Sequence, residues 1–440
     1  MSALAAGERR DGRSALWHPF ADMGAVDGGR FVLDRAEGVW VWDEEGRRYL
    51  DASASLWYSN LGHGRPEIAA AVADQLARLD AFNIFGGNAN RPAVELADRL
   101  AALAPEQGAR VFLGAGGGDM IDSAAKIARA HFQLSGRPER THLISRRHGY
   151  HGTHGIGTSI GGIEDNISGW GRLLPDVSAV ADDDPEALEA EIARLGPERV
   201  AAFYCEPVIG AGGVILPAPG YIEAVAEICA RTGVLFVADC VVCGFGRLGT
   251  WLGIDRWPVQ PDLIAVAKGI TGGALPLGAL LVAERVAAPF FPGRAGAPML
   301  RHGATFAGHP ACCAAALAAM DLYERDDVIE RGRSLEGTLD AALGAVREHP
   351  LVGATRSGLG LLAGVDLDAR VLAQAPDAVG RWYEACRDEG VLVRPLRRGI
   401  AVSPPLTITE DQLRELGAAL AAGLDALAAD LPANVPEHPA

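Results

Sequence analysis

The sequence predicts an α/β fold, with a large domain built on a mainly parallel sheet and a smaller α+β domain. The chain of 440 residues is longer than one ordinary domain needs, so two unequal units are expected. Its hydrophobic fraction of 49% can fill a large core. Between residues 111 and 267, short apolar runs alternate with stretches of helical spacing. That alternation is typical of buried parallel strands covered by helices.

The N-terminal part alternates apolar and polar residues over residues 31–51, which predicts short antiparallel strands. Helical spacing that starts at a proline predicts helices over residues 66–78 and 92–103. Five apolar runs are the predicted strands of the main sheet, at residues 111–113, 143–144, 200–204, 234–238 and 263–267.

Further helices are expected over residues 120–132, 185–195, 221–231, 309–324 and 328–347. Residues 351–431 are expected to form a small α+β lobe. Its last helix should begin at Thr409, with Gln412 placed three residues on for a capping box.

The charge pattern argues against two classes of partner. The formal net charge is −16 and no block of basic residues stands out, so we expect neither nucleic acid nor a membrane as a partner. The longest apolar stretch, residues 278–283, is too short to span a bilayer.

The N-terminal sequence MSALAAGERRDGR lacks an apolar core, so no signal peptide is expected. Seven scattered cysteines, an odd number, indicate reduced thiols and a cytoplasmic protein.

Lysine is rare in this chain. Lysine and arginine together number 40, and only Lys126 and Lys268 are lysines. Codon bias toward arginine explains the general pattern. Arginine stays protonated in proteins and cannot replace an amine nucleophile. If the protein uses lysine chemistry, only these two positions can supply it.

A glycine-rich segment, residues 114–119, follows a predicted strand and precedes a predicted helix. Backbone amides and a helix N-terminus at that place could hold a phosphate, although a structural turn would look similar. The segment lacks the Gly-Lys-Ser/Thr of the nucleotide P-loop. It also fits the spaced dinucleotide fingerprint poorly.

Three charged residues also stand at strand ends, where open α/β sheets bind ligands. Asp239 and Lys268 close the runs 234–238 and 263–267, and Glu206 follows the run 200–204. A lysine desolvated in this way has a lowered pKa and a reactive amine. Each residue could instead form a structural ion pair, Asp239 for example with Arg247. Together, a phosphate cradle, a buried acid and a strand-end amine are the groups that pyridoxal phosphate (PLP) requires.

Four separated segments carry a family resemblance that runs from about Trp17 to Leu424. They are residues 236–247 (FVADCVVCGFGR), 267–269 (AKG), 149–152 (GYHG) and 302–310 (HGATFAGHP). The chain resembles the class III (omega-) aminotransferases within the fold-type I PLP-dependent enzymes, and amine:pyruvate transaminases in particular. The resemblance implies a large PLP-binding domain over residues 66–325 and a small domain formed by residues 1–65 and 326–440.

By this resemblance, Lys268 is expected to form the Schiff base with the cofactor and to shuttle protons. Asp239 would keep the pyridine nitrogen protonated, and Tyr150 and Val241 would pack on the two ring faces. The other expected cofactor-binding residues are Gly117 and Gly118 through their amides, Thr305 of the neighbouring subunit, His151 and Glu206.

Two features depart from the family pattern. Gly116 and Gly118 stand where the family usually has serines, so a hydroxyl donor to the phosphate is missing. Cys240 stands where a glutamate usually follows the ring aspartate. Cys240 and Cys243 have CxxC spacing, but we find no further residues at metal spacing and interpret both as buried thiols.

Residues for the substrates also follow from the resemblance. Trp57 and Phe85 resemble the aromatic lining of amine:pyruvate transaminases, although core or interface packing would explain Phe85 as well. Arg394 matches the mobile arginine that binds the α-carboxylate. Residues 400–405 lack the arginine of ornithine and γ-aminobutyrate members, which favours pyruvate over 2-oxoglutarate. Arg397 and Arg398 lie close enough to replace that missing group.

The sequence therefore predicts a transaminase that moves an amino group from an omega-amine, a diamine or a related donor to pyruvate. It should work as a homodimer with shared active sites, and pairing of dimers into tetramers stays open. Within the family, a 2-oxoglutarate-using, decarboxylating or aminomutase enzyme is the alternative. Outside it, the alternatives are a nucleotide-dependent oxidoreductase and a catalytically silent binding protein.

Overall fold

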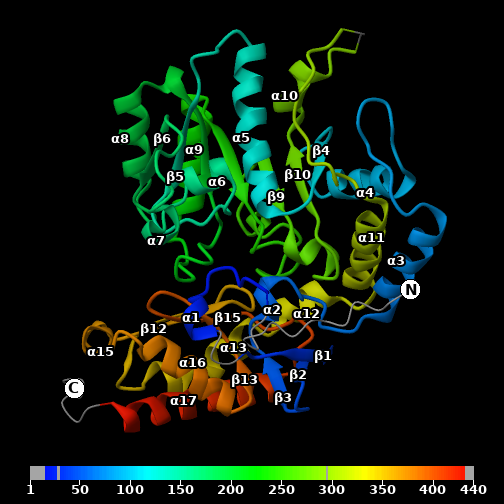
Figure 1. Ribbon diagram of the computed structural model, residues 1–440. Coiled ribbons are helices and arrows are strands. Elements are labelled where there is room, and N and C mark those ends of the chain that lie inside the picture. Colours follow the sequence, from blue (N-terminus) through cyan, green and yellow to red (C-terminus); the bar gives the residue numbers. More distant parts are fainter. Residues whose placement is uncertain (1–14, 27–29, 294–295, 432–440) are drawn as a thin grey trace.

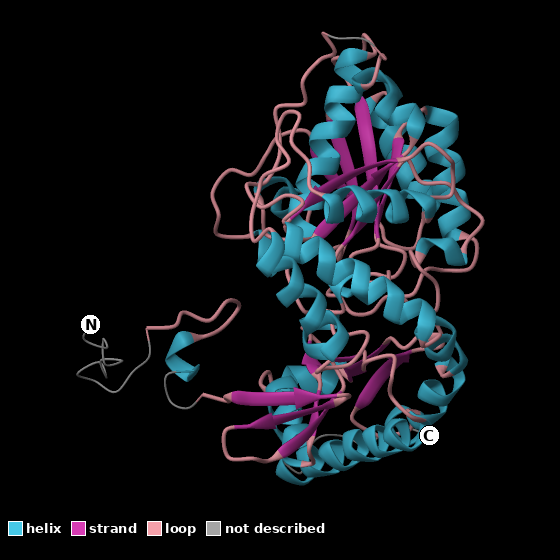
Figure 2. Ribbon diagram, turned by 90° about the vertical axis from the view of Figure 1, so that its right-hand side faces the viewer, coloured by secondary structure: helices cyan, strands magenta, loops and turns pink. Residues whose placement is uncertain are grey.

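The computed structural model describes residues 15–26, 30–293 and 296–431 (Figure 1). The sequence on which the signal-peptide expectation rests, residues 1–13, lies outside this range. The chain forms two lobes (Figure 2). The larger lobe holds a seven-stranded sheet between helices, and the smaller lobe holds two four-stranded sheets. Among the described residues, no helix has the length and apolarity that crossing a membrane requires.

The sheet of the larger lobe has the strand order β4-β10-β9-β8-β7-β5-β6. Its parallel part consists of β5 (His142–Arg146), β6 (Val177–Val180), β7 (Val200–Cys205), β8 (Leu235–Asp239) and β9 (Leu263–Val266). β10 (Gly278–Val282) runs antiparallel to β9 and to β4 (Arg110–Gly114). All five predicted strands are present, so the α/β prediction with a mainly parallel sheet is confirmed.

The five inner strands of this sheet are buried on both faces, which explains their apolar runs. Alternate residues of β7 and β8 belong to different clusters: Phe203 and Phe236 pack in one, Tyr204 and Val237 in the other. Sequence reasoning missed β6, and it described residues 278–283 only as an apolar stretch too short to span a bilayer, not as a strand. The short loop between β9 and β10 holds no crossover helix, so the chain returns antiparallel.

Helices cover both faces of this sheet and flank it (Figure 1). They are α3 (Pro66–Arg78), α4 (Arg91–Ala102), α5 (Gly117–Leu134), α8 (Pro185–Leu195), α9 (Tyr221–Thr232) and α11 (Pro310–Arg325). The predicted helix over residues 328–347 was wrong in one respect, because the chain forms three short helices there. These are α12 (Val328–Ser334), α13 (Glu336–Ala342) and α14 (Gly344–Arg347). Glycines at 332, 337 and 344 weaken a continuous helix.

The smaller lobe combines strands from both ends of the chain. β1 (Leu33–Glu37), β2 (Trp40–Asp43) and β3 (Arg48–Asp51) form a meander, and β13 (Val391–Leu392) adds to β3 in parallel. The second sheet has the order β11-β12-β15-β14, from β11 (Val352–Arg356), β12 (Ala363–Leu367), β15 (Gly399–Val402) and β14 (Arg394–Pro395). α16 (Ala378–Asp388) and α17 (Glu410–Asp430) pack beside them. The predicted capping box of Thr409 and Gln412 is present at the start of α17.

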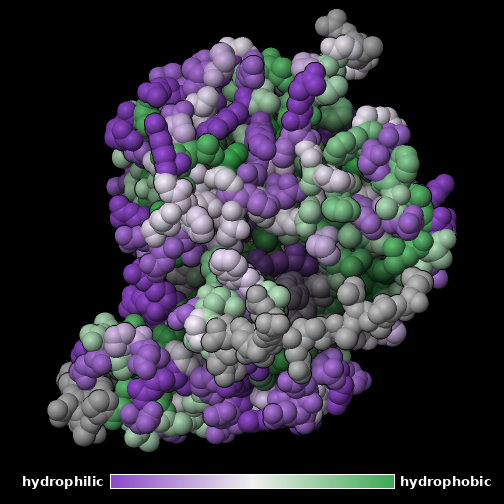
Figure 3. Space-filling model, in the orientation of Figure 1, coloured by the Kyte–Doolittle hydropathy of each residue, from purple (hydrophilic) through white to green (hydrophobic). Residues whose placement is uncertain are grey.

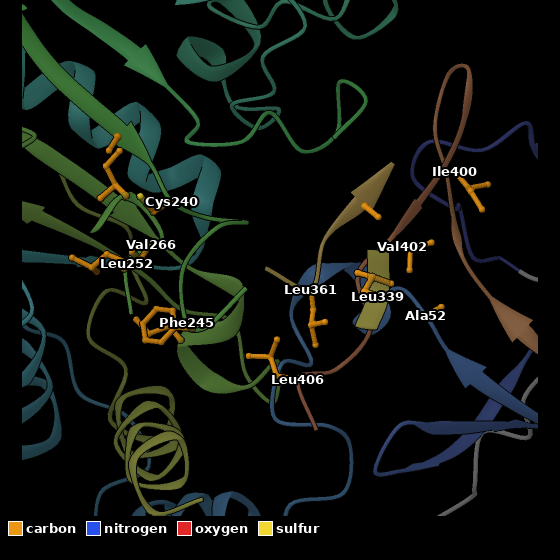
Figure 4. Packing of buried hydrophobic residues seen from close by; sticks show 14 of the residues in the cluster. Ala52, Cys240, Phe245, Leu252, Val266, Leu339, Leu361, Ile400, Val402 and Leu406 are labelled. Carbon is orange, nitrogen blue, oxygen red and sulfur yellow. The ribbon is translucent and has the colours of Figure 1, made fainter. Parts of the chain in front are cut away.

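One hydrophobic cluster continues from the larger lobe into the smaller one. Figure 4 shows Val266 and Phe245 on one side and Leu361, Leu406 and Val402 on the other. The fully buried guanidinium of Arg247 adds polar links, because it donates to the carbonyls of residues 361 and 404 and to Oδ1 of residue 60, over 2.7 to 2.8 Å. The two lobes are therefore joined by a shared core and by the hydrogen bonds of the two terminal nitrogens of this buried guanidinium.

Candidate active site

A cavity of about 520 Å³ opens at the carboxyl ends of the parallel strands. Figure 3 shows that the surface is hollowed between the two lobes. The cavity is lined by the first turn of α5, by the loop after β5 and by the ends of β8 and β9. Tyr58, which follows the short helix α2 (Ala54–Trp57), contributes from the N-terminal segment. The position agrees with the ligand-binding edge expected for an open α/β sheet.

Lys268 lies on the cavity wall two residues after the end of β9, at the start of a 3-10 turn. Its φ of +51° is unusual for a residue with a side chain. The following Gly269 is necessary, because a Cβ there would lie 2.6 Å from the Asn60 side chain. Burial lowers the pKa of the Lys268 amine, while the carboxylates of Asp239 and Glu206 act in the opposite direction. The result is an amine that loses its proton more readily than an exposed lysine.

Asp239, at the end of β8, is buried and bonded on both carboxylate oxygens. Oδ2 lies 2.8 Å from Nδ1 of the buried His151, and Oδ1 accepts the amide of Val241 at 3.1 Å. The alternative that Asp239 pairs with Arg247 was wrong, because that arginine is bound between the lobes. His151 therefore contacts the predicted ring aspartate itself, which orients the carboxylate in the cavity.

Glu206, after β7, fixes the loop that carries Tyr150. One carboxylate oxygen accepts the Tyr150 amide at 2.9 Å, and the other accepts the Gly210 amide at 2.9 Å. Burial raises the pKa of Glu206. The nearby charge of Asp239 raises this pKa further, whereas His151 acts to lower it. Both oxygens are thus used by the backbone, which places Tyr150 on the cavity wall.

The glycine-rich turn between β4 and α5 packs tightly against the rest of the site. A Cβ at Gly117 would lie 2.7 Å from Cγ1 of Val241, so only glycine fits there. The first amides of a helix have no acceptor within the helix. Gly117 and Gly118 form this first turn and line the cavity. The turn can therefore receive an anion next to Val241.

Trp57 is held in a strained turn close to Lys268. Ala54, Ser55 and Trp57 all have positive φ angles, and Nζ of Lys268 lies 5.6 Å from the centre of the indole ring. The buried Asp51 stabilises this turn, because its carboxylate accepts the amides of residues 53 and 55 and pairs with Nε2 of residue 63 at 2.9 Å. Sequence reasoning missed Asp51, whose place just before the turn was the only available signal.

Phe85 and Thr305 do not line the cavity of their own chain. Both are exposed, on two neighbouring loops: a Cβ at Gly303 would lie 3.5 Å from the Phe85 ring. The Phe306 side chain beside them is 67% exposed. These residues therefore belong to an outer surface of the single chain.

Arg394 differs from its two neighbouring arginines. Arg397 pairs with Asp165 at 3.6 Å, and Arg398 pairs with Asp366 at 3.8 Å. Within the described residues, the Arg394 guanidinium forms no ion pair with a carboxylate. Burial raises the pKa of the Tyr150 phenol, and the positive charge of Arg394 opposes that effect. Arg394 is not among the residues that line the cavity, but it is the one guanidinium of this group without a carboxylate partner in the described chain, and its charge acts on Tyr150.

The cavity contains the donor set that PLP needs. Within one space of about 520 Å³ lie an amine with a lowered pKa, a buried carboxylate and a glycine turn at a helix N-terminus. That volume is in the usual range for cofactor sites. Sequence reasoning did not single out several other lining residues, namely Thr153, His154, Leu275, Pro276 and Leu277.

Comparisons with known proteins agree with this geometry. The family model "Aminotransferase class-III" matches residues 23–424. The chain is 36% identical to the omega-aminotransferase of Caulobacter vibrioides, over 91% of this chain and 94% of that protein. It is 34% identical to the putrescine–pyruvate aminotransferase of Pseudomonas aeruginosa, over 90% and 91%. It is also 32% identical to gamma aminobutyrate transaminase 3 of Solanum lycopersicum, over 92% and 81%.

Solved structures give the same result. A PLP-bound amine transaminase from an uncultivated Pseudomonas species superposes with a TM-score of 0.89 at 37% identity, covering 94% of this chain and 99% of that one. This agreement favours the PLP fold over the nucleotide-dependent oxidoreductase that the glycine turn had left open. The matched family model and the shared length of these relatives place the chain in the class-III aminotransferases, which are PLP-dependent transaminases.

Proposed function

We propose that this transaminase transfers an amino group from an omega-amine or diamine to pyruvate, by a ping-pong mechanism. The observation that carries the choice of acceptor is Arg394, which has no carboxylate partner among the described residues and lies close enough to influence Tyr150. A single guanidinium fits the one carboxylate of pyruvate. The relatives named for omega-amines and for putrescine with pyruvate support the same choice.

Each residue of the cavity would have its own role in binding the cofactor or in moving a proton. When bound, PLP supplies an electron-withdrawing ring and the carbon through which amino groups are exchanged. Lys268 would hold the cofactor through its amine and then, once released, carry a proton to and from the substrate. Asp239, oriented by His151, would keep a positive charge on the ring nitrogen. Glu206 would hold Tyr150 against one ring face, opposite Val241.

A 2-oxoglutarate-using enzyme is the second candidate, favoured by the γ-aminobutyrate transaminase among the relatives. Against it, Arg397 and Arg398 are engaged with carboxylates, and residues 400–405 contain no arginine. Initial rates with a panel of monoamines, diamines and γ-aminobutyrate, each paired with pyruvate and with 2-oxoglutarate, separate the two. Faster turnover with 2-oxoglutarate would contradict our proposal. Product analysis distinguishes transamination from decarboxylation and from amino-group migration.

Arg394→Ala is expected to impair the pyruvate half-reaction selectively. Loss of a charge-assisted hydrogen bond should lower kcat/KM for pyruvate roughly ten- to a hundredfold. The half-reaction with an amine that carries no carboxylate should change little. Single-turnover absorbance measurements of each half-reaction test this. Arg397→Ala is the matched control, because it removes an exposed arginine of the same segment that already has a carboxylate partner. An equal loss in both half-reactions would refute a role in carboxylate binding.

We also propose that two chains form a homodimer in which Phe85 and Thr305 reach the cavity of the other copy. Phe82, Phe85 and Phe306 are each at least half exposed around these loops. Such a patch of aromatic side chains is costly to leave in water. A dimer would cover the patch and bring a hydroxyl to the phosphate turn. Association of dimers into tetramers is measurable by light scattering on the same samples.

Shared sites predict that two inactive variants complement each other. Thr305→Asp should repel the phosphate, and Lys268→Ala removes the amine, so each variant alone should be inactive. In mixed dimers one of the two sites is intact, and random mixing should restore about a quarter of the wild-type activity. Coexpression with two affinity tags isolates the mixed dimer. An inactive mixed dimer would show that Thr305 does not act across subunits.

We infer that the protein works in the cytoplasm. All seven cysteines are free, and burial raises the pKa of each of their thiols. A reducing compartment suits this set of thiols. Cell fractionation of the tagged protein tests the location.

A further inference from the structure

The phosphate turn of this chain offers no side-chain donor. Residues 114–118 are four glycines and one alanine, so no side chain of the turn itself carries a hydrogen-bond donor. A bound phosphate group carries up to two negative charges and several acceptor oxygens. The amides of Gly117 and Gly118, with the one hydroxyl of Thr305 proposed from the other copy, can satisfy only part of this demand. A further donor from the same chain would therefore strengthen phosphate binding.

His154 occupies the space next to this turn. A Cβ at Gly118 would lie 3.2 Å from Nδ1 and 3.5 Å from Cε1 of the His154 ring. The first distance is tighter than an ordinary carbon contact, so a side chain at 118 would compete with the imidazole for the same space. His154 also lines the cavity together with Gly117, Gly118 and Lys268. A side chain at 118 would therefore press against this exposed ring and push it aside.

The backbone around His154 is fixed against α5. His154 directly precedes α6 (Gly155–Ser159), and the carboxylate of Asp122 on α5 accepts the Gly157 amide at 2.9 Å. On the other side of His154, a Cβ at Gly152 would lie only 2.7 Å from Cα of Gly118. The two glycines thus let the loop touch the first turn of α5, and Asp122 holds the following helix in place.

The imidazole of His154 forms no hydrogen bond or ion pair with another group among the described residues. Its two nearest histidine neighbours in sequence are committed: His148 Nδ1 lies 2.8 Å from Asp182, and His151 Nδ1 lies 2.8 Å from Asp239. His154 makes no such contact within the described residues. An imidazole carries at least one N–H in either protonation state, so the ring can donate to an anion in both.

We propose that His154 is a phosphate-binding residue of this enzyme and replaces the hydroxyl donor that its glycine-rich turn lacks. The inference rests on the proposed PLP site and adds to it the residue that directly precedes α6. It also explains why glycine at 118 is compatible with cofactor binding. The ring supplies the donor, and the absence of a side chain at 118 leaves room for it.

The test compares two probes that differ only in the phosphate. Apoprotein is titrated with PLP and with pyridoxal, which has the same ring and aldehyde, and binding is followed by visible absorption. His154→Asn should weaken PLP binding roughly ten- to a hundredfold, the range for losing a hydrogen bond to a charged group. Pyridoxal binding should stay unchanged. His148→Asn is the matched control, because asparagine tolerates the positive φ of this residue and the side chain lies outside the cavity.

A second variant tests the shared space. Gly118→Ser alone should weaken PLP binding, because the new side chain displaces the ring. In the His154→Ala background, the same serine should instead strengthen binding relative to His154→Ala alone. Thermal melting of each apoprotein confirms that the fold is intact.

The outcomes are distinguishable. A wild-type apoprotein that binds neither probe would refute the PLP site itself. If the wild type binds PLP, equal PLP affinity in His154→Asn would overturn the inference and leave the site standing. Parallel weakening of PLP and pyridoxal would also overturn it, because a contact to the phosphate cannot affect pyridoxal. If Gly118→Ser binds PLP more tightly while His154 is present, a side chain at 118 does not compete with the His154 ring for space.

Discussion

Lys268→Ala should abolish transamination and the covalent attachment of the cofactor. The amine lies in the cavity, and burial lowers its pKa, so it is prepared to attack an aldehyde. Loss of both the nucleophile and the proton carrier should reduce turnover about 10⁴-fold or more. The purified wild type should have a visible absorption band that shifts when an amine donor is added. After borohydride reduction, mass spectrometry should find the cofactor on residue 268 of the wild type and nowhere on the variant.

The chain offers an unusually clean control for this experiment. Lys126 is the only other lysine, and Lys126→Arg removes its amine while keeping the positive charge. That lysine lies on the exposed side of α5, 3.2 Å from the His302 ring and away from the cavity lining. Its replacement should leave the absorption band and turnover unchanged. A colourless wild type that stays colourless with added PLP would contradict the proposed cofactor site.

The direction of the pKa shift of Lys268 can also be measured. The neutral amine is the reactive form, so capture of PLP by the apoprotein should speed up as pH rises through the pKa of Lys268. Because burial lowers this pKa, the midpoint should fall below the 10.5 of an ordinary lysine. The charges of Asp239 and Glu206 raise the pKa, so neutralising either carboxylate should move the midpoint further toward acid.

Much of the site could be predicted because the chemistry lies at strand ends. Apolar runs located β7, β8 and β9, and parallel strands deliver their last residues to one edge, so Glu206, Asp239 and Lys268 meet there. The contacts between loops could not be predicted in the same way. The partner of Asp239 is His151, from a loop 88 residues earlier, and no local pattern specifies that pairing.

Other differences have local physical causes. Asp51 stabilises three positive φ angles beside Trp57, a conformation for which the sequence offers no glycine as a signal. His154 follows the recognisable GYHG segment, but its position next to Gly118 depends on packing between α5 and α6. The exposed positions of Phe85 and Thr305 depend on how the loops fold over the edge of the lobe. Strand periodicity carries no information about any of these contacts.

Asp239→Asn should separate cofactor binding from catalysis. Asparagine keeps the shape of the side chain and can still accept the Val241 amide, so the buried site should remain folded. It loses the negative charge beside His151 and can no longer stabilise a proton on the ring nitrogen of the cofactor. PLP should therefore still bind through Lys268 and the glycine turn, while transamination falls about 10²- to 10⁴-fold. Cofactor content and single-turnover rates measure the two effects separately.

A second aspartate–histidine pair serves as a control for the pair in the cavity. It shows whether the loss of turnover depends on where the aspartate lies or only on losing a carboxylate beside a histidine. Asp182 and His148 form a pair of the same length, 2.8 Å, outside the cavity, so Asp182→Asn should leave turnover near the wild-type level. Reconstitution of Asp239→Ala with N-methylated PLP supplies a fixed positive charge on the ring and should recover part of the lost rate. If Asp239→Asn turns over like the wild type, a charge at this position is not required. If the methylated cofactor gives no recovery although it binds, the carboxylate acts other than by stabilising positive charge on the ring.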